Sequence, residues 1–334
     1  MAKILRMILL WPVALVYQTI IFIRNRMFDA GIFHSKSFSV PVICIGNLEV
    51  GGSGKTPTAD FILKYLGGKY KIAYLSRGYK RKSSGFVLAN PNSKIEDLGD
   101  EAFLIYQKWK ERIVLAVDSN RRRGIQKIME LHPETTFILL DDGMQHRWVK
   151  PKLLIQLTPF VKPFFKNTLL PKGRLRDHPR EYRRSDILVF TKAPFATESQ
   201  LSKAKTELNK AGFSLKPTFV SALHYGKPIN NKRETLAENT EVVAVAGLAS
   251  NLSFFDWVEK HHSVQNRISK PDHYRYLPGF FSQYQINQQI VLTTEKDYHK
   301  LVALAPDPSR VFYLPIEMEI YPEKPFLESI ESLL

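Results

Sequence analysis

The feature that most constrains this chain is a glycine-rich turn at residues 46–56, placed between an apolar run and a helical pattern. The run at 40–45 predicts a strand, and the pattern at 55–66 predicts a helix. Glycines allow consecutive backbone N–H groups to turn inward and hold phosphate oxygens at the start of a helix. A lysine and a threonine at the end of such a turn reach the phosphates and a magnesium ion. The sequence therefore predicts a site for a nucleoside triphosphate and Mg²⁺ formed by Gly51, Gly52, Ser53, Gly54, Lys55 and Thr56.

An apolar strand that ends in two carboxylates supports the same interpretation. Residues 137–140 are apolar and are followed by Asp141 and Asp142. In proteins with this phosphate-binding turn, an acid at the end of a nearby strand holds magnesium directly or through water. We therefore predict that Asp141 and Asp142 join Thr56 as metal-site residues. A solvated Asp-Gly turn that only ends a strand is the alternative interpretation.

The alternation of strand and helix signals indicates the fold class. Strand signals at 71–75, 113–117 and 136–140 alternate with helix signals at 100–110 and 120–131. Such alternation favours an α/β fold, here a P-loop NTPase-like parallel sheet with helices on both faces.

Further strand signals follow the first half and predict a smaller C-terminal α/β lobe. We expect three parts: an N-terminal helix in 1–35, a P-loop core with a basic loop in 36–185, and the C-terminal lobe in 186–334. The strand signals beyond the core lie at 186–191, 242–246, 263–268, 290–294 and 311–314.

The N-terminal segment has the character of a membrane-associated helix. Residues 7–23 are largely apolar, with Arg6 before them and Arg24 after them, and no signal-peptidase site follows. The run is short for a bilayer span, which needs about 20 apolar residues. Basic flanks and aromatic residues predict an amphipathic helix that lies in or dips into a membrane interface. A buried helix that covers a lobe is the alternative.

The charge balance points to a polyanionic partner. The chain has 48 Lys and Arg against 32 Asp and Glu, a formal net charge of +16. Nucleic acid, an anionic membrane and a phosphorylated substrate all fit such a balance. The segment 161–184 is rich in basic residues and proline and predicts a long functional loop rather than regular structure. The single cysteine, Cys44, lies in an apolar run and predicts a buried, inert thiol.

Two other classes of protein remain as rivals on these residues. A P-loop ATPase or GTPase that couples hydrolysis to assembly of another protein would explain the glycine-rich turn. A nucleic-acid-binding protein would explain the charge. We expect no nucleic-acid partner, because no recognisable nucleic-acid module or aromatic stacking platform is present.

Several motifs in one order give the chain a specific resemblance, which extends from the N-terminal apolar helix to about residue 300. The chain resembles the tetraacyldisaccharide 4'-kinase family. The motifs that carry the resemblance are GNLEVGGSGKTPT at 46–58, SRGYKR at 76–81, GDEAFL at 99–104, DDGMQHR at 141–147, LLPKGRLRD at 169–177 and TTEKD at 293–297.

The resemblance implies roles for individual residues. Lys55 and Thr56 would bind the triphosphate of ATP and its Mg²⁺. Asp100 would act as the general base on the sugar hydroxyl, and His273 would pair with it, so that Asp100, His273 and Lys55 are the implied catalytic residues. The implied substrate-binding residues are Arg77, Arg121, Gln145, His146 and Arg176. Asp177 stands where the family often has Glu.

The resemblance also implies a reaction and a location. The enzyme would transfer the γ-phosphate of ATP to the 4'-hydroxyl of tetraacyldisaccharide 1-phosphate and form lipid IVA in lipid A biosynthesis. The lipid substrate would be an acylated glucosamine disaccharide 1-phosphate. The enzyme would act at the anionic cytoplasmic face of the bacterial inner membrane, as a peripheral or monotopic protein.

Overall fold

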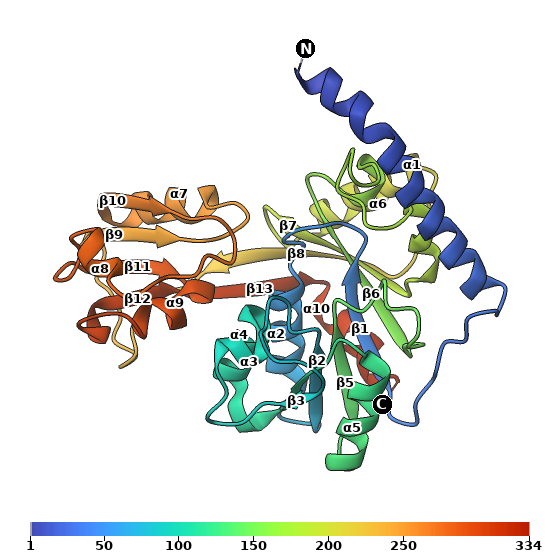
Figure 1. The fold of residues 1–334 in the computed structure, drawn as a ribbon, viewed down its shortest axis with the longest axis horizontal. Helices are drawn as coiled ribbons and strands as arrows, with labels where there is room; N and C mark the ends of the chain where they lie inside the picture. Colours follow the sequence, from blue (N-terminus) through green and yellow to red (C-terminus); the bar gives the residue numbers. More distant parts are fainter. Residues whose placement is uncertain (1, 334) are drawn as a thin grey trace. The chain divides into compact units, whose positions relative to one another are not determined.

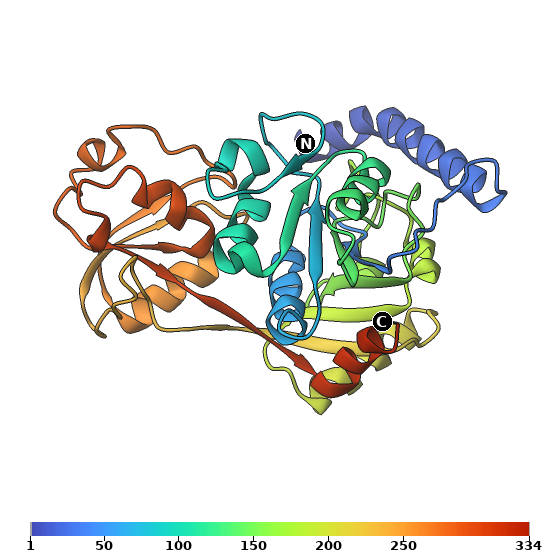
Figure 2. The ribbon, with the colours of Figure 1, turned by 90° about the horizontal axis from the view of Figure 1, so that it is seen from below.

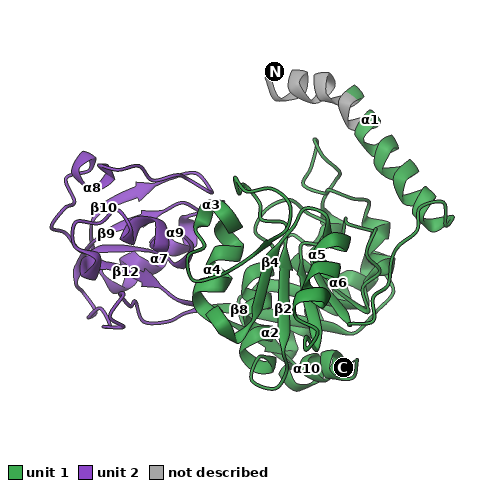
Figure 3. Ribbon diagram, turned by 60° about the horizontal axis from the view of Figure 1, so that its bottom comes forward, with its two compact units in different colours: residues 1–223, 318–334 green, residues 224–317 purple. Residues whose placement is uncertain are grey.

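A computed structural model describes residues 2–333 and, in the first helix, the side chains of residue 12 and of residues from 15 onward (Figures 1 and 2). The chain forms two compact units (Figure 3). The first contains residues 1–223 and 318–334, and the second contains residues 224–317. The chain therefore leaves the first unit once and returns to it.

A nine-stranded sheet forms the centre of the first unit, in the order β13-β8-β7-β6-β1-β5-β2-β4-β3. The neighbours from β8 to β4 all run parallel, and β3 is antiparallel to β4. The strands are β1 Val42–Asn47, β2 Ile72–Ser76, β3 Val87–Leu88, β4 Val114–Val117, β5 Phe137–Asp141, β6 Leu153–Pro159, β7 Ile187–Ala193, β8 Thr218–Tyr225 and β13 Ile316–Tyr321.

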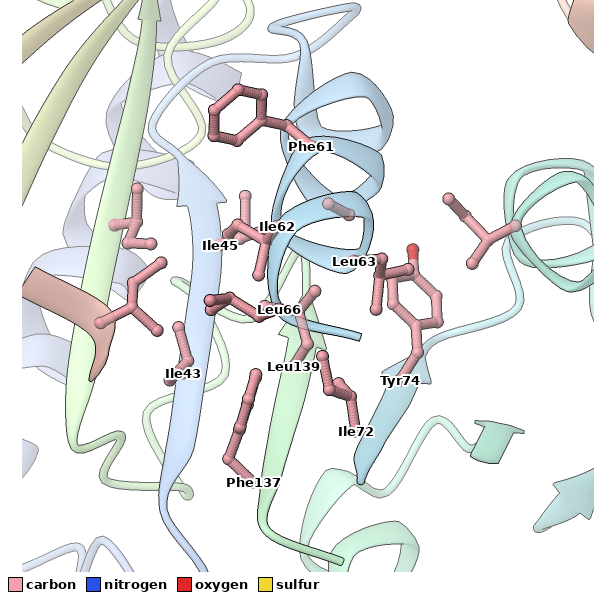
Figure 4. Close-up of a cluster of buried hydrophobic side chains, with 14 of the residues drawn as sticks. Ile43, Ile45, Phe61, Ile62, Leu63, Leu66, Ile72, Tyr74, Phe137 and Leu139 are labelled. Carbon is pink, nitrogen blue, oxygen red and sulfur yellow. The ribbon is translucent and has the colours of Figure 1, made fainter. Parts of the chain in front are cut away.

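Successive residues of β1 point to opposite faces of this sheet and enter two separate cores. Ile43 and Ile45 pack with Ile62 and Leu66 of α2 on one face (Figure 4). Cys44, buried as predicted, packs on the other face with residues of α5 and α6. Helices thus cover both faces, which confirms the predicted parallel α/β sheet. The helices of this unit are α1 Ala2–Asp29, α2 Lys55–Leu66, α3 Ile95–Leu98, α4 Asp100–Trp109, α5 Arg121–Leu131, α6 Glu198–Lys210 and α10 Glu323–Glu331, with 3-10 turns at Lys110–Arg112, Phe164–Lys166 and Pro179–Arg184.

The second unit has its own parallel sheet, in the order β10-β9-β11-β12. Buried clusters on its two sides give it a separate core. Its elements are β9 Glu241–Ala246, α7 Leu252–His261, β10 Ser263–Ser269, α8 Phe280–Gln283, β11 Val291–Thr294, α9 Glu295–Val302, the 3-10 turn Pro308–Arg310 and β12 Val311–Leu314.

The boundary between the units differs from the one expected at 185/186. Strands β7 and β8 continue the sheet of the first unit, and β13 returns to pair beside β8. Leu188 and Phe190 of β7 are buried in the same core as β1. Hydrogen bonding and burial therefore assign 187–223 and 318–334 to the first unit.

The N-terminal helix α1 is 28 residues long. Among the residues described, no helix is both long and apolar enough to cross a membrane. Several apolar side chains of α1 are exposed, among them Val16, Ile20 and Ile23 at 60%, 61% and 52%. Ile21, Asn25 and Phe28 are buried. One side of α1 therefore packs on the first unit while apolar side chains elsewhere on it remain exposed.

Candidate active site at the phosphate-binding turn

The glycine-rich turn lies between β1 and α2, as the sequence predicts. Gly51 and Gly54 have φ angles of +100° and +86°, which side-chain-bearing residues rarely adopt. The N–H of Ser53 donates to the carbonyl of Gly51 at 2.9 Å, which closes a tight turn ahead of the helix. The Ser53 hydroxyl is buried without a hydrogen-bond partner among the described residues. This turn has the backbone that a phosphate site requires.

Lys55, the first residue of α2, extends toward the end of the sheet. Its Nζ lies 3.4 Å from Asn47 Oδ1 and 3.7 Å from Asp142 Oδ1. The side chain of Lys55 thus joins the strand before the turn to the acid after β5. A cation in this position can contact the terminal phosphates of a bound nucleotide.

The two predicted acids occupy different environments. Asp141 ends β5 and is buried, whereas Asp142 follows with a φ of +49°. Burial raises the pKa of Asp141 to about 6, the Lys55 charge opposes this rise, and the Asp142 charge adds to it. Burial also raises the pKa of Asp142, but the Arg176 hydrogen bonds and the Lys55 charge outweigh it and lower that pKa to about 2. The pair therefore carries negative charge near neutral pH.

The acid pair and Thr56 fit the magnesium ion of a nucleotide complex. Asp141 Oδ1 is buried and has no hydrogen-bond partner within the part of the chain that the structure describes. No group of three or more His, Cys, Asp or Glu in that part could hold a metal by itself. Magnesium commonly binds one or two carboxylates and completes its shell with phosphates and water. The residues present suit that mode.

Arg176 connects the acid pair to β1. Its Nη1 and Nη2 donate to the two carboxylate oxygens of Asp142 at 2.9 and 2.7 Å. Its Nη2 also donates to the carbonyl of Asn47 at 3.2 Å and to the Asn47 side chain. Such a two-bond contact fixes the plane of the guanidinium as well as its position.

The basic loop is hydrogen-bonded to the glycine-rich turn itself. The N–H of Val50 donates to the carbonyl of Arg174 and the N–H of Arg176 donates to the carbonyl of Leu48, both at 2.7 Å. Glu49, which occupies the usual first glycine position, is buried and accepts from Asn167 Nδ2. The loop predicted at 161–184 is therefore joined to the glycine-rich turn by hydrogen bonds.

Besides Arg176, the predicted substrate residues Arg121, His146 and Gln145 belong to the same part of the site. Arg121 begins α5 and is only 4% exposed, and its Nη1 donates to the carbonyls of Asp118 and Ser119 at 3.2 Å each. Burial lowers the pKa of Arg121, while the charges of the acid pair raise it and the charge of Arg77 lowers it. Burial and the charges of Arg121, Arg122 and Arg77 lower the pKa of His146 to about 4. His146 is therefore neutral at pH 7.

Gln145 completes this group of predicted residues. Its Nε2 donates to the carbonyl of Asn47 at 2.7 Å, which ties the loop after β5 to the end of β1. Gln145 Oε1, His146 Nε2 and Arg121 Nε are buried without hydrogen-bond partners among residues 2–333. Unpaired buried polar atoms are costly, and several of them in one place suggest a ligand that pairs with them.

Asp100 and His273 belong to different units. Asp100 is the first residue of α4, and Gly99, with a φ of +82°, is the N-cap instead. A Cβ on Gly99 would lie 2.6 Å from the carbonyl oxygen of Tyr79, so two of the sequence motifs pack closely here. His273 lies between β10 and α8 of the second unit, with its Nε2 at 3.3 Å from Lys296 Nζ. Their pairing stays a prediction.

Lys192 is a site residue that the sequence did not indicate. It lies on β7, and a Cβ on Gly52 would be 3.5 Å from its Nζ. Burial and, to a smaller extent, the charge of Arg174 lower the pKa of Lys192. Beside it, the Thr191 hydroxyl donates to the carbonyl of Ser53 at 2.9 Å. The sequence signal that could have indicated Lys192 is its position directly after the strand predicted at 186–191.

Close packing between β1 and the loop after β5 predicts how a substitution at Gly46 changes the stability of the protein. A Cβ on Gly46 would lie 2.5 Å from Met144 Cβ. We expect Gly46→Ala to destabilise the protein by about 1–3 kcal/mol, the usual cost of overpacking a core. Thermal unfolding measures this loss. Gly68→Ala is the control because a Cβ there meets nothing within 4 Å; equal melting temperatures for the two variants would contradict the packing described.

Comparison with known proteins agrees with this geometry. A family model described as tetraacyldisaccharide-1-P 4'-kinase matches residues 6–334. Tetraacyldisaccharide 4'-kinases from Bacteroides thetaiotaomicron and Flavobacterium psychrophilum are 36% and 38% identical to this chain. The alignments cover 93% and 92% of this chain and 88% and 91% of those relatives.

A solved structure has the same fold. It is the "apo" form of LpxK from Aquifex aeolicus in complex with ATP, which is 31% identical with a TM-score of 0.78. The match covers 97% of this chain and 98% of that one. The family resemblance seen in the motifs is thereby confirmed, and this chain belongs to the tetraacyldisaccharide 4'-kinase family.

Proposed function

We propose that this chain transfers the γ-phosphoryl group of ATP to the 4'-hydroxyl of tetraacyldisaccharide 1-phosphate and forms lipid IVA. The observation that carries the proposal is the convergence of Lys55, Asp142 and Arg176 on the glycine-rich turn, beside an unpaired carboxylate oxygen of Asp141. Charges placed in this way suit phosphoryl transfer, in which positioning and charge neutralisation supply most of the catalysis.

The turn and Lys55 act on the donor. Backbone N–H groups at 51–54 and the Lys55 ammonium hold the β- and γ-phosphates, and Thr56, Asp141 and Asp142 would hold Mg²⁺. The bound ion would neutralise charge on the phosphate oxygens. Lys192, near Gly52, adds a second cation at the same turn.

The acceptor supplies a hydroxyl, whose proton needs a base. A bond forms between the acceptor oxygen and the γ-phosphorus while the bond from that phosphorus to the β,γ-bridging oxygen breaks, and ADP leaves. Asp100 takes the proton, and the family resemblance alone supports the proposed pairing of His273 with it. A general base of this kind contributes about 10²–10⁴-fold to the rate.

The remaining polar groups near the acid pair would bind the substrate's head group. Arg121 and Arg176 offer positive charge to its phosphate, with Arg77 close enough to influence Arg121. Neutral His146 and Gln145 have unpaired polar atoms available for sugar hydroxyls. Because these atoms are buried, each such hydrogen bond would be stronger than the same bond in water.

The acyl chains need an apolar surface near this head-group site. A cavity of about 350 Å³ opens between α1 and the basic loop, with Leu15, Ile21, Phe22 and Leu169 in its lining. Arg180 and Arg183 lie at the same cavity. Asp29 and Glu181 also line the cavity and pair with Arg183, so the apolar walls carry the assignment. We assign this cavity to an acyl chain of the substrate.

The exposed apolar side of α1 would enter the cytoplasmic leaflet of the inner membrane. Val16, Ile20 and Ile23 recur at helical spacing and are all exposed. The basic loop, with eight Lys or Arg against two acids between Lys162 and Arg184, would face the anionic lipids. Each basic residue near such a surface contributes about 1 kcal/mol. We therefore propose a peripheral attachment.

This attachment gives a binding prediction. The triple variant Val16→Ser, Ile20→Ser and Ile23→Ser should bind vesicles of phosphatidylethanolamine and phosphatidylglycerol at least about tenfold more weakly, because burying an aliphatic side chain contributes about 1.5–3 kcal/mol. Flotation with the vesicles measures the change. Leu131→Ser, which removes an exposed apolar side chain from α5, is the control. Equal binding of wild type and triple variant would exclude α1 as the anchor.

The function itself is tested with γ-labelled ATP and tetraacyldisaccharide 1-phosphate in detergent. A labelled lipid in the organic extract is the expected result. Release of labelled inorganic phosphate with no labelled lipid would instead favour an ATPase that acts on another partner.

A further inference from the structure

Three side chains of α1 contact the segment that carries Arg176. The Tyr17 hydroxyl donates to the backbone carbonyl of Arg176 at 3.0 Å. Asn25 Nδ2 donates to Asp177 Oδ1 at 2.8 Å, and Arg24 Nη2 donates to Asp177 Oδ2 at 3.1 Å. Asn25 is 5% exposed and Asp177 is fully buried, so the bond between them lies inside the molecule, whereas the Tyr17 and Arg24 bonds are partly buried.

The partners of Asp177 account for both of its carboxylate oxygens. Besides Asn25 and Arg24, the N–H of His178 donates to Oδ1 at 2.9 Å. Removing one hydrogen-bond donor from a buried carboxylate strongly destabilises the folded arrangement that holds it. Asp177 therefore depends on α1 for its placement, and it is bound to α1 rather than turned toward the acid pair.

Arg176, the next residue, is held from several directions. Its N–H donates to the carbonyl of Leu48, its carbonyl accepts from Tyr17, and its guanidinium holds Asp142. A continuous path of hydrogen bonds thus runs from α1 to one of the acids at the phosphate-binding turn. A second contact joins α1 to the loop after β5, since Arg147 donates to the carbonyl of Asn25 at 3.1 Å and to Asp29 at 2.7 Å.

We propose that α1 is a positioning element of the kinase site, in which Tyr17, Asn25 and Asp177 set the place of Arg176 and through it of Asp142. This role is separate from membrane attachment, since Tyr17 and Asn25 contact the first unit while Val16, Ile20 and Ile23 are exposed. The inference rests on the proposed function, because Arg176 is assigned there to the phosphoryl-transfer site.

The test compares turnover in detergent, where membrane attachment is not required. Tyr17→Phe removes one hydroxyl, and we expect kcat to fall about 3–10-fold, the range expected for one lost hydrogen bond that serves the transition state. Asn25→Leu leaves Asp177 short of a donor and should lower kcat at least about tenfold. The KM for ATP should stay unchanged in both. Lys324→Gln, at an exposed position on α10, should keep wild-type kcat.

A double-mutant comparison separates positioning from a general loss of structure. In an Arg176→Lys background, Tyr17→Phe should change kcat less than twofold, because the residue through which it acts has already been altered. Thermal unfolding of each variant checks the fold. Equal fold-losses in both backgrounds, or no loss from either α1 variant in the wild-type background, would overturn the proposal. Wild-type protein that makes no phosphorylated lipid would instead refute the proposed function.

Discussion

Lys55→Ala should lower lipid phosphorylation by about 10²–10³-fold, the usual effect of removing one group that stabilises transition-state charge. Lys55 Nζ lies 3.7 Å from Asp142 Oδ1 at the start of α2, where the terminal phosphates of ATP would be held. The variant loses this charge and leaves the acid pair less compensated. Steady-state kinetics with varied ATP measures both kcat and KM.

A lysine on the same helix provides the control for that variant. Lys64 is exposed in the last turn of α2, so Lys64→Ala changes the net charge equally but at the far end of the helix. Its kinetics should match those of wild type. Unchanged turnover in Lys55→Ala would remove Lys55 from the transfer step.

Asp100→Asn should lower kcat by about 10²–10⁴-fold while ATP binds normally, because the amide keeps the shape of the side chain but cannot accept the proton. Asp100 is the first residue of α4, where the N-cap is Gly99 and where the loop at 77–81 packs closely. Single-turnover phosphorylation measures the chemical step, and equilibrium binding of a non-hydrolysable ATP analogue measures affinity.

Glu96→Gln serves as the matched control for Asp100, since Glu96 is an exposed acid one turn upstream, on α3. It should have wild-type turnover. If Asp100→Asn lost nucleotide binding together with turnover, Asp100 would have a structural role at the start of α4 and the base would have to be sought elsewhere.

The parts of the site that the sequence predicts are those built from local patterns. The turn at 51–54 and the helix at 55–66 depend on neighbouring residues, and the structure has α2 with those bounds. The acid pair after β5 also follows from one apolar strand and its ending. Parallel strands bring such ends to one edge of a sheet, which is why the residues meet.

The parts that the sequence did not predict depend on distant pairing. Strand β13 joins a sheet whose other strands end before residue 226, and its pairing beside β8 left no local signal. The backbone bonds between 48–50 and 174–176 likewise join segments more than a hundred residues apart. The contact of Asn25 with Asp177 is also a pairing between distant segments, and the sequence of neither segment indicates it.

The helix α1 makes polar contacts that its apolar sequence does not predict. The run at 7–23 predicts an interfacial helix from its apolar character, but Tyr17 within it and Arg24 and Asn25 after it contact the segment that carries Arg176. In the described part of α1, Asn25 is buried on the packed side together with Ile21 and Phe28, while Val16, Ile20 and Ile23 are exposed. A helix with apolar side chains both packed and exposed fits an element placed between an enzyme site and a membrane.

The most direct test of the central claim is the position of the transferred phosphate. Purified protein would be incubated with ATP, Mg²⁺ and either tetraacyldisaccharide 1-phosphate or its 4'-deoxy analogue, and the lipids analysed by mass spectrometry. The account predicts one added phosphate on the first lipid and none on the second. A phosphate added to both lipids, or to neither while ATP is consumed, would contradict it.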